Sequence, residues 1–315
     1  MRKRITAVLL CILMVASGGC TSAASAAPDT SKIRIVATIF PVYDWIRELT
    51  AGSEDVEIRL LMNKGTDLHS YQPTADDMIA LENCDLFVYV GGESDAWTAD
   101  ALKNVRKEHT DLSLMEKLDS LVNEEVVEGM EGEEEDAYDE HIWLSLRNAE
   151  KCCTMITDAL KEIDPQNAQL YSSNHDAYTE KLSSLDDEFE KTVSASARDT
   201  LVFADRFPFR YLCEDYGLDY YAAFPGCSAE SEASFETVRF LAEKLDELDL
   251  HRVIITESSD GRIAGTIIDN TAAKDAEILK LHSMQSVTEE KIAEGTTYLS
   301  CMEEDLEVLK EALHE

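Results

Sequence analysis

The chain has 315 residues, of which 64 are acidic and 28 are basic, and its formal net charge is −36 at pH 7. Because no basic stripe offsets this charge, the composition excludes a nucleic-acid-binding protein, and a field this negative attracts cations and suppresses aggregation. The length is sufficient for two lobes.

The first twenty residues predict a lipoprotein signal peptide. Arg2–Arg4 form a positive start, Ile5–Val15 form an apolar run too short to span a bilayer, and Ser17–Gly19 are small residues that precede Cys20. This order is typical of a lipobox, in which Cys20 is lipidated; an ordinary signal peptide cut a few residues later is the alternative. Residues 21–31 are expected to be a flexible tether. The mature protein is expected to be soluble and anchored outside the cytoplasmic membrane.

Six further cysteines follow Cys20. None forms a C-x-x-C zinc pattern, and the adjacent pair Cys152-Cys153 lies in a helical pattern, where buried packing is the expected role. The compartment permits disulfides, but the sequence does not pair them. The six are Cys84, Cys152, Cys153, Cys213, Cys227 and Cys301.

Residues 32–163 predict an α/β lobe, because β-rich runs alternate with helical segments. Strands are expected at 32–40, 56–62 and 84–90. A loop that contains Gly and Pro follows the second strand and carries His69. This alternation favours a mostly parallel sheet.

An acidic loop at 124–140 precedes His141. The bulky residues Ile142, Trp143 and Leu144 follow at once and are expected to be buried. The imidazole would then lie at the edge of a core, where packing fixes the position of a metal ligand. A single histidine is more often exposed or hydrogen-bonded, so this stretch gains weight only from polar residues elsewhere in the chain.

Residues 164–197 predict a long connecting helix. Asp164 suits the N-cap and Pro165 suits the first turn. No Gly or Pro interrupts its apolar stripe, so the helix is expected to be stiff. His175 belongs to the stripe and is interpreted as a packed or hydrogen-bonded residue rather than a ligand. The stripe consists of Tyr171, His175, Tyr178, Leu182, Leu185, Phe189 and Val193.

Residues 198–315 predict a second α/β lobe. Its expected strands are 200–204, 219–224, 251–256 and 276–281, and an amphipathic helix closes the chain. The fold class is therefore α/β, with two lobes of mostly parallel sheet joined by one long rigid helix.

Polar residues collect where the predicted strands end. His69, Asp205, Glu257 and His282 each lie at or just past the carboxyl end of a strand, where open α/β sheets bind ligands. With His141 they provide three imidazoles and two carboxylates that could converge between the lobes. Such donors suit Zn²⁺, or Mn²⁺ and Fe²⁺ if oxygen dominates. For Glu257, local capping or salt-bridging is the alternative.

The chain resembles the substrate-binding lipoproteins of bacterial zinc and manganese ABC importers over essentially its whole mature length. The resemblance rests on ATIFPVYDW, on DLHSYQPT around His69, on DEHIWLSLRNA around His141, on the long helix and on the closing GTTYLSCMEEDLEVLKEAL. It implies two α/β lobes joined by a rigid helix, one metal site in the cleft between them, no catalysis, and delivery of the metal to a membrane permease. A monomer that meets the membrane only through its lipid is expected.

The resemblance implies His69 and His141 as two ligands. Family members usually carry the third in HxAFxYF or a Glu version of it. Here FADRFPFRYL has one residue more, so we assign Asp205, whereas strict counting reaches Arg206, a cation that cannot bind a metal. The fourth is usually an Asp in LDPL, and LHSM here supplies His282. The implied set of His69, His141, Asp205 and His282 points to Zn²⁺ over Mn²⁺, with Glu257 as an additional candidate.

One departure from the family concerns the loop at 124–140. Zinc members often have a His-rich loop there, whereas this loop has no histidine and can attract cations only weakly, or is simply disordered. The rivals to a zinc carrier are a Mn²⁺ or Fe²⁺ carrier, a surface adhesin of the same fold, and a metal-dependent hydrolase with Glu257 as its base. No H-E-x-x-H pattern supports the hydrolase.

Overall fold

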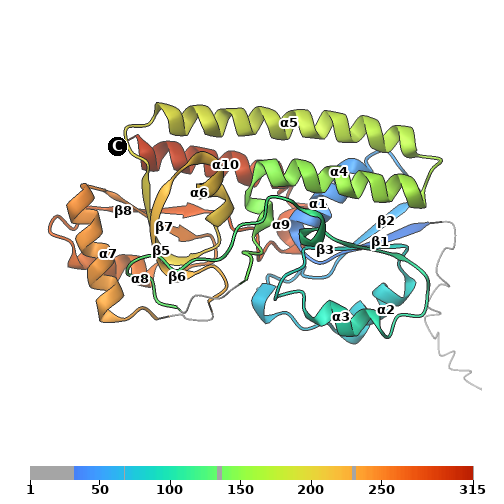
Figure 1. The fold of residues 1–315 in the computed structure, drawn as a ribbon, viewed down its shortest axis with the longest axis horizontal. Helices are drawn as coiled ribbons and strands as arrows, with labels where there is room; N and C mark the ends of the chain where they lie inside the picture. The colour runs from blue at the N-terminus through green and yellow to red at the C-terminus, as the bar shows by residue number, and fades with distance from the viewer. Residues whose placement is uncertain (1–31, 67, 133–136, 229–231, 315) are drawn as a thin grey trace, which may run out of the picture. The chain divides into compact units, whose positions relative to one another are not determined.

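The computed structural model describes residues 32–66, 68–132, 137–228 and 232–314, and residues 32–315 form one compact unit. It contains two four-stranded sheets, each with all its strands parallel, and helices on the faces of both (Figure 1). This arrangement confirms the predicted α/β class. The predicted signal peptide, Cys20 and the tether lie outside the described residues.

The first sheet has the strand order β2-β1-β3-β4. Its fourth strand is absent from the sequence prediction, because Thr110-Asp111-Leu112-Ser113 contains one apolar residue and pairs only with β3 at the edge of the sheet. The strands are β1 (Ile33–Ala37), β2 (Val56–Leu60), β3 (Leu86–Tyr89) and β4 (Thr110–Ser113). The accompanying helices are α1 (Phe40–Leu49), α2 (Ala75–Asn83), α3 (Trp97–Leu102) and α4 (Leu146–Ile163).

The second sheet has the strand order β6-β5-β7-β8. Its first strand in the chain continues to Phe207, beyond the predicted end at 204, and its register against β6 shifts between Phe203 and Arg206. Asp205 therefore lies inside a strand and not at its end. The strands are β5 (Thr200–Phe207), β6 (Asp219–Pro225), β7 (Arg252–Thr256) and β8 (Glu277–Leu281). The helices are α6 (Arg210–Tyr216), α7 (Phe235–Leu248) and α8 (Arg262–Asn270).

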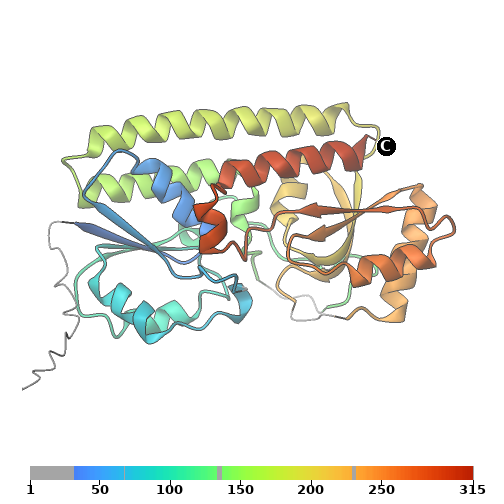
Figure 2. The ribbon, with the colours of Figure 1, turned by 180° about the vertical axis from the view of Figure 1, so that it is seen from behind.

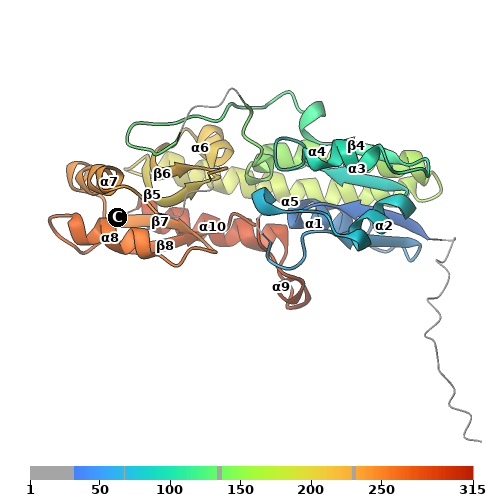
Figure 3. The same ribbon diagram turned by 90° about the horizontal axis from the view of Figure 1, so that it is seen from below.

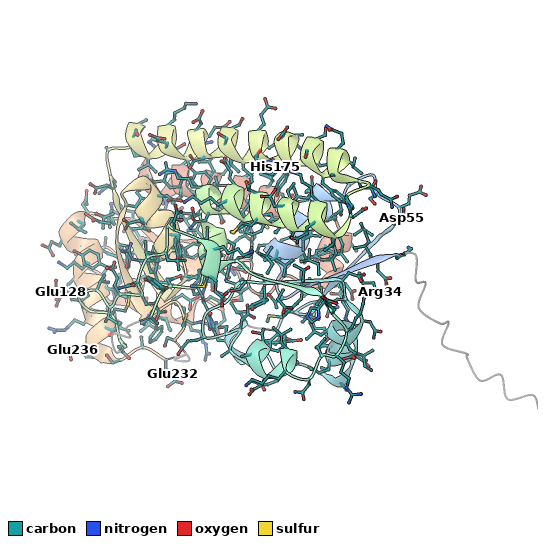
Figure 4. All side chains as sticks on the ribbon, turned by 45° about the vertical axis from the view of Figure 1, so that its right-hand side comes forward. Arg34, Asp55, Glu128, His175, Glu232 and Glu236 are labelled. Carbon is teal, nitrogen blue, oxygen red and sulfur yellow. The ribbon has the colours of Figure 1, made fainter. Side chains whose placement is uncertain are left out.

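The long helix α5 (Ala168–Ala195) packs against α4 and α1 beside the first sheet and against α10 (Tyr298–Leu313) and α6 beside the second (Figures 1 and 2). Its predicted stripe is buried at Tyr171, Tyr178, Leu182, Leu185 and Phe189. His175 is only half-buried, and its Nε2 lies 3.0 Å from the hydroxyl oxygen of Thr154 on α4 (Figure 4). The stripe is thus a packing face, as its spacing predicts.

Buried hydrogen bonds tie the two halves together. The backbone N–H of Tyr298 donates to Asp44 Oδ2 at 2.7 Å, and the Tyr298 hydroxyl donates to the carbonyl of Trp143 at 2.7 Å. The Trp143 indole then donates to the carbonyl of Ser283 at 2.8 Å. Each such bond contributes about 1 kcal/mol, and the core around them is continuous from β1 to α10. These contacts favour small movements of the two halves over wide opening.

The described part of the acidic loop is docked on the second sheet (Figure 3). The Glu131 N–H donates to the carbonyl of Ala223 on β6 at 2.9 Å, and Glu125 accepts a 2.6 Å bond from the Tyr220 hydroxyl. Gly129 has φ +82°, and a Cβ there would lie 2.0 Å from the Phe240 ring. This part of the loop is therefore ordered by backbone pairing and close packing. In the described ranges, no helix combines the length and apolar character required to cross a membrane.

Candidate metal centre

His69 lies in the 3-10 turn Leu68–Ser70, which follows β2. Leu68 anchors the turn, because its side chain is buried in the hydrophobic core that runs from β1 to α10. Nδ1 of His69 lies 3.1 Å from Glu140 Oε1 and 2.8 Å from Ser94 Oγ. These oxygens hold the ring proton on Nδ1, so the lone pair that binds a metal is on Nε2.

His141 is the N-cap of the 3-10 turn Ile142–Leu144, and all three residues of that turn are fully buried. The imidazole is itself 0% exposed and packs edge-on against Trp143, with ring centroids 5.2 Å apart. The bulky residues after His141 thus hold it in a core, as the sequence predicts.

A buried carboxylate orients the His141 ring. Asp139 Oδ1 lies 2.9 Å from Nδ1 of His141 and accepts a 2.8 Å bond from its backbone N–H. Burial by itself lowers the pKa of His141. The charge and hydrogen bond of Asp139 raise this pKa by more than burial lowers it, so the net pKa lies above its ordinary value. Nε2 of His141 is buried and has no hydrogen-bond partner among the described residues. A carboxylate on one ring nitrogen and a lone pair on the other is the usual arrangement of a metal-binding histidine.

The turn after β6 closes against His141. A Cβ on Gly226 would lie 2.8 Å from Cε1 of His141 and 2.9 Å from the carbonyl oxygen of Phe207. Only glycine permits this approach of the backbone to the ring. The next side chain, that of Cys227, is brought to the two histidines by this contact.

One donor atom from each of His69, His141 and Cys227 lies within 4.8 Å of the other two. The imidazole centroids are 5.5 Å apart, and Cys227 Sγ lies 3.7 Å from Glu140 Oε1. Burial, and then the negative charge of Glu140, raise the pKa of the Cys227 thiol, which is therefore neutral before a metal binds. Cys227 is not among the ligands predicted from the sequence, because it belongs to no C-x-x-C pattern. Its place just after β6 was the available signal.

Glu140 connects these donors without being one of the three. It is 2% exposed, lies beside His69, and accepts hydrogen bonds from the Ser94 hydroxyl and, at 3.0 Å, from the Ser94 N–H. A Cβ on Gly92 would lie 2.7 Å from its Oε2, so the backbone fits closely around it. Burial raises the pKa of Glu140, but the hydrogen bond from His69 and the charge of His141 bring it below its ordinary value. A buried anion beside the donors favours a cation.

Asp205 makes its hydrogen bonds within the second sheet. Its Oδ2 accepts a 2.8 Å bond from the Thr256 hydroxyl, and its Oδ1 accepts a 2.8 Å bond from the N–H of Arg206. The metal-ligand cluster found among the described residues does not include it. Its assignment as the third ligand stays a prediction.

His282 and Glu257 are also engaged elsewhere. Nε2 of His282 lies 2.8 Å from Glu304 Oε2 on α10, and its backbone N–H donates to Asp305 at 2.7 Å. Glu257 accepts bonds from the N–H and the hydroxyl of Ser283, just after β8, at 2.8 and 3.1 Å. Neither residue joins His69 and His141 in the cluster among the described residues.

The known proteins that this chain resembles include zinc-binding and zinc-uptake proteins. The family described as zinc-uptake complex component A, periplasmic, matches residues 35–312. The zinc-binding lipoprotein AdcA of Streptococcus pneumoniae is 30% identical over 89% of this chain, which spans only 56% of that relative's length. The high-affinity zinc uptake system protein ZnuA of Bacillus subtilis is 27% identical over 97% of this chain and 96% of its own. The crystal structure of the Zn(II)-bound ZnuA-like domain of S. pneumoniae AdcA has a TM-score of 0.73 and 26% identity, and the match covers 90% of this chain and all of that domain.

Proposed function

The chain belongs to the family of periplasmic zinc-uptake components, and from this premise we propose that it binds Zn²⁺ outside the cytoplasmic membrane and delivers it to the permease of an ABC importer. Zinc is the cargo of this protein and not a catalytic cofactor. The family is described as part of an uptake complex, which is a transport role. The proposed protein is a monomer that is anchored through a lipid on Cys20. Its signal sequence, and the name of a relative as a lipoprotein, support the lipid anchor.

The observation that carries this proposal is the pair of oriented imidazoles. Nδ1 of each ring faces a buried carboxylate, Glu140 for His69 and Asp139 for His141. Nε2 of His141 is buried without a hydrogen-bond partner among the described residues. Leaving such an atom unsatisfied costs about 1–3 kcal/mol. A metal ion bound between the two rings removes this cost.

The donor chemistry favours zinc over manganese. Imidazole nitrogen suits Zn²⁺, whereas Mn²⁺ prefers carboxylate and water oxygen. The carboxylates nearest the two rings, Asp139 and Glu140, are already bonded to the ring nitrogens and to Ser94. A Mn²⁺ or Fe²⁺ carrier remains the rival within this transport class. Glu257, the base considered for a hydrolase, is hydrogen-bonded to Ser283 and is not part of the cluster of His69, His141 and Cys227 among the described residues, so the geometry gives a hydrolase no support.

Competitive metal titration of residues 21–315 tests the proposal. We expect one tightly bound Zn²⁺ per chain that Mn²⁺ does not displace, and a loss of roughly 100-fold or more in zinc affinity for His69→Ala and for His141→Ala. His175→Ala is the matched control, since that ring bonds to Thr154 on the surface of α4. Wild-type zinc affinity in either of the first two variants would place the site elsewhere. Preferential binding of Mn²⁺ would establish the rival, and slow growth of a deletion strain only in low zinc would separate transport from adhesion.

A further inference from the structure

We propose that Cys227 is the third metal ligand, so that the centre is a His₂Cys site selective for thiophilic ions. The proposal rests on the zinc-binding function proposed above and names the chemical class of ion that the same site prefers. It replaces Asp205 by a sulfur donor and predicts discrimination in favour of Zn²⁺ and Cd²⁺ against Mn²⁺ and Mg²⁺.

The three donor side chains already lie close together. The ligand atoms of His69, His141 and Cys227 all lie within 4.8 Å of one another. In a tetrahedral zinc site, a nitrogen and a sulfur ligand are about 3.5 Å apart. The three donors therefore need to approach one another by at most about 1.3 Å. A rotamer change at Cys227 moves its sulfur by more than this, and small shifts of the two imidazoles close the remaining distance.

The His141 ring itself requires a further partner next to this turn. Nε2 of His141 is a fully buried polar atom without a hydrogen-bond partner among the described residues. The backbone at Gly226 touches the same ring, because a Cβ there would lie 2.8 Å from Cε1 and 3.1 Å from Nδ1 of His141. The turn that carries Cys227 is thus built against the imidazole that requires a ligand.

The other candidate ligands, Asp205 and His282, are already hydrogen-bonded elsewhere. Both carboxylate oxygens of Asp205 accept hydrogen bonds within the second sheet, and His282 lies beside Glu304 on α10. The Cys227 thiol lies 3.7 Å from Glu140 Oε1 and also contacts the carboxylate of Glu124. Recruiting Cys227 breaks these two thiol contacts, whereas recruiting Asp205 breaks bonds to Thr256 and Arg206.

Metal binding at Cys227 requires loss of the thiol proton. The metal–sulfur bond forms as the S–H bond of Cys227 breaks, and the proton leaves to water, so one proton is released for each ion bound. A thiolate is a soft ligand that Zn²⁺ and Cd²⁺ accept readily and that Mn²⁺ and Mg²⁺ do not favour. The cysteine thus supplies a selectivity that two imidazoles alone lack.

Cobalt spectroscopy of residues 21–315 tests the ligand directly. We expect the Co²⁺-loaded wild type to show a sulfur-to-cobalt charge-transfer band in the near ultraviolet, and Cys227→Ser to lack it. Cys227→Ser should also lower zinc affinity by about 100-fold and leave the weak Mn²⁺ affinity unchanged, so that the preference for zinc narrows. Cys227→Ala is the second variant, and the metal-free melting temperature of both shows that they fold.

Cys84→Ser is the matched control. The Cys84 thiol is buried in the first half and donates to the carbonyl of Leu81 at 3.2 Å, a bond that a serine hydroxyl reproduces. This variant should keep the charge-transfer band and the zinc affinity. One tightly bound Co²⁺ or Zn²⁺ that depends on His69 and His141 but shows no sulfur band, with wild-type affinity in Cys227→Ser, would overturn the cysteine assignment and leave the zinc-binding function standing. No tight binding of either ion would overturn both.

Discussion

Replacing Gly226 with alanine tests whether the turn after β6 holds the donors in register. The added Cβ would lie 2.8 Å from Cε1 of His141 and 2.9 Å from the carbonyl oxygen of Phe207. One of these neighbours is backbone, and the other is a fully buried ring hydrogen-bonded to Asp139. Neither can give way easily, so the turn itself has to move and carries Cys227 with it.

Overpacking of this kind costs about 1–3 kcal/mol. We expect urea unfolding of the metal-free Gly226→Ala variant to show a loss of stability in this range. We also expect competitive titration to show zinc affinity lower by about 10-fold, which corresponds to about 1.4 kcal/mol spent on restoring the donor geometry.

The matched control is Gly265→Ala in α8, where an added Cβ meets nothing within 4 Å. Because glycine inside a helix is less favourable than alanine, this variant should be more stable by about 0.5–1 kcal/mol and bind zinc as the wild type does. If the Gly226→Ala variant has the stability to urea and the zinc affinity of the wild type, then the contact between the turn and the His141 ring does not position the centre.

Two further predictions concern the carboxylate that orients His141. Asp139→Asn should lower zinc affinity by about 10- to 100-fold while keeping one ion per chain. The reason is that the substitution removes a negative charge, and this charge orients Nδ1 and makes the ring a stronger metal ligand. Competitive titration measures the affinity, and an unchanged affinity would mean that Asp139 has only a structural role. Zinc affinity should also fall as the pH drops through the pKa of His141, which Asp139 holds above 6.5, because the protonated ring has no lone pair to offer. In the metal-free protein, the sign is opposite: a raised pKa stabilises the folded state fully below 6.5, and this contribution is lost as the pH rises through the folded pKa. Zinc titrations and urea midpoints of the metal-free protein across about pH 5 to 8 would show the two trends, and parallel trends would contradict the assignment.

Most elements of the fold could be predicted from local patterns. Apolar runs mark the strands that are buried in the two parallel sheets, and the stripe from Tyr171 to Phe189 marks the packed face of α5. The failures have a common cause. The edge strand β4 contains little apolar sequence and exists through its pairing with β3, and β5 extends through Asp205 and Arg206 because Arg206 pairs with Phe224 of β6.

For the candidate site, the sequence by itself was sufficient to predict His69 and His141, because each lies in a motif defined by its immediate neighbours. His69 follows a strand and lies in a turn anchored by Leu68. His141 precedes three bulky apolar residues that are buried in the folded chain. Only the tertiary structure decided what joins them. The distance from Cys227 to His141 depends on how the turn after β6 meets a ring 86 residues earlier, a contact made possible by the missing side chain of Gly226. Asp205 and His282 were predicted by the same rule of strand ends, but Asp205 lies inside β5, and both residues form hydrogen bonds within the second half, to Thr256 and Arg206 and to Glu304. Spacing along the chain does not show which of several polar side chains form hydrogen bonds with nearby residues in the folded state. Those hydrogen bonds decide which side chains remain available to bind a metal.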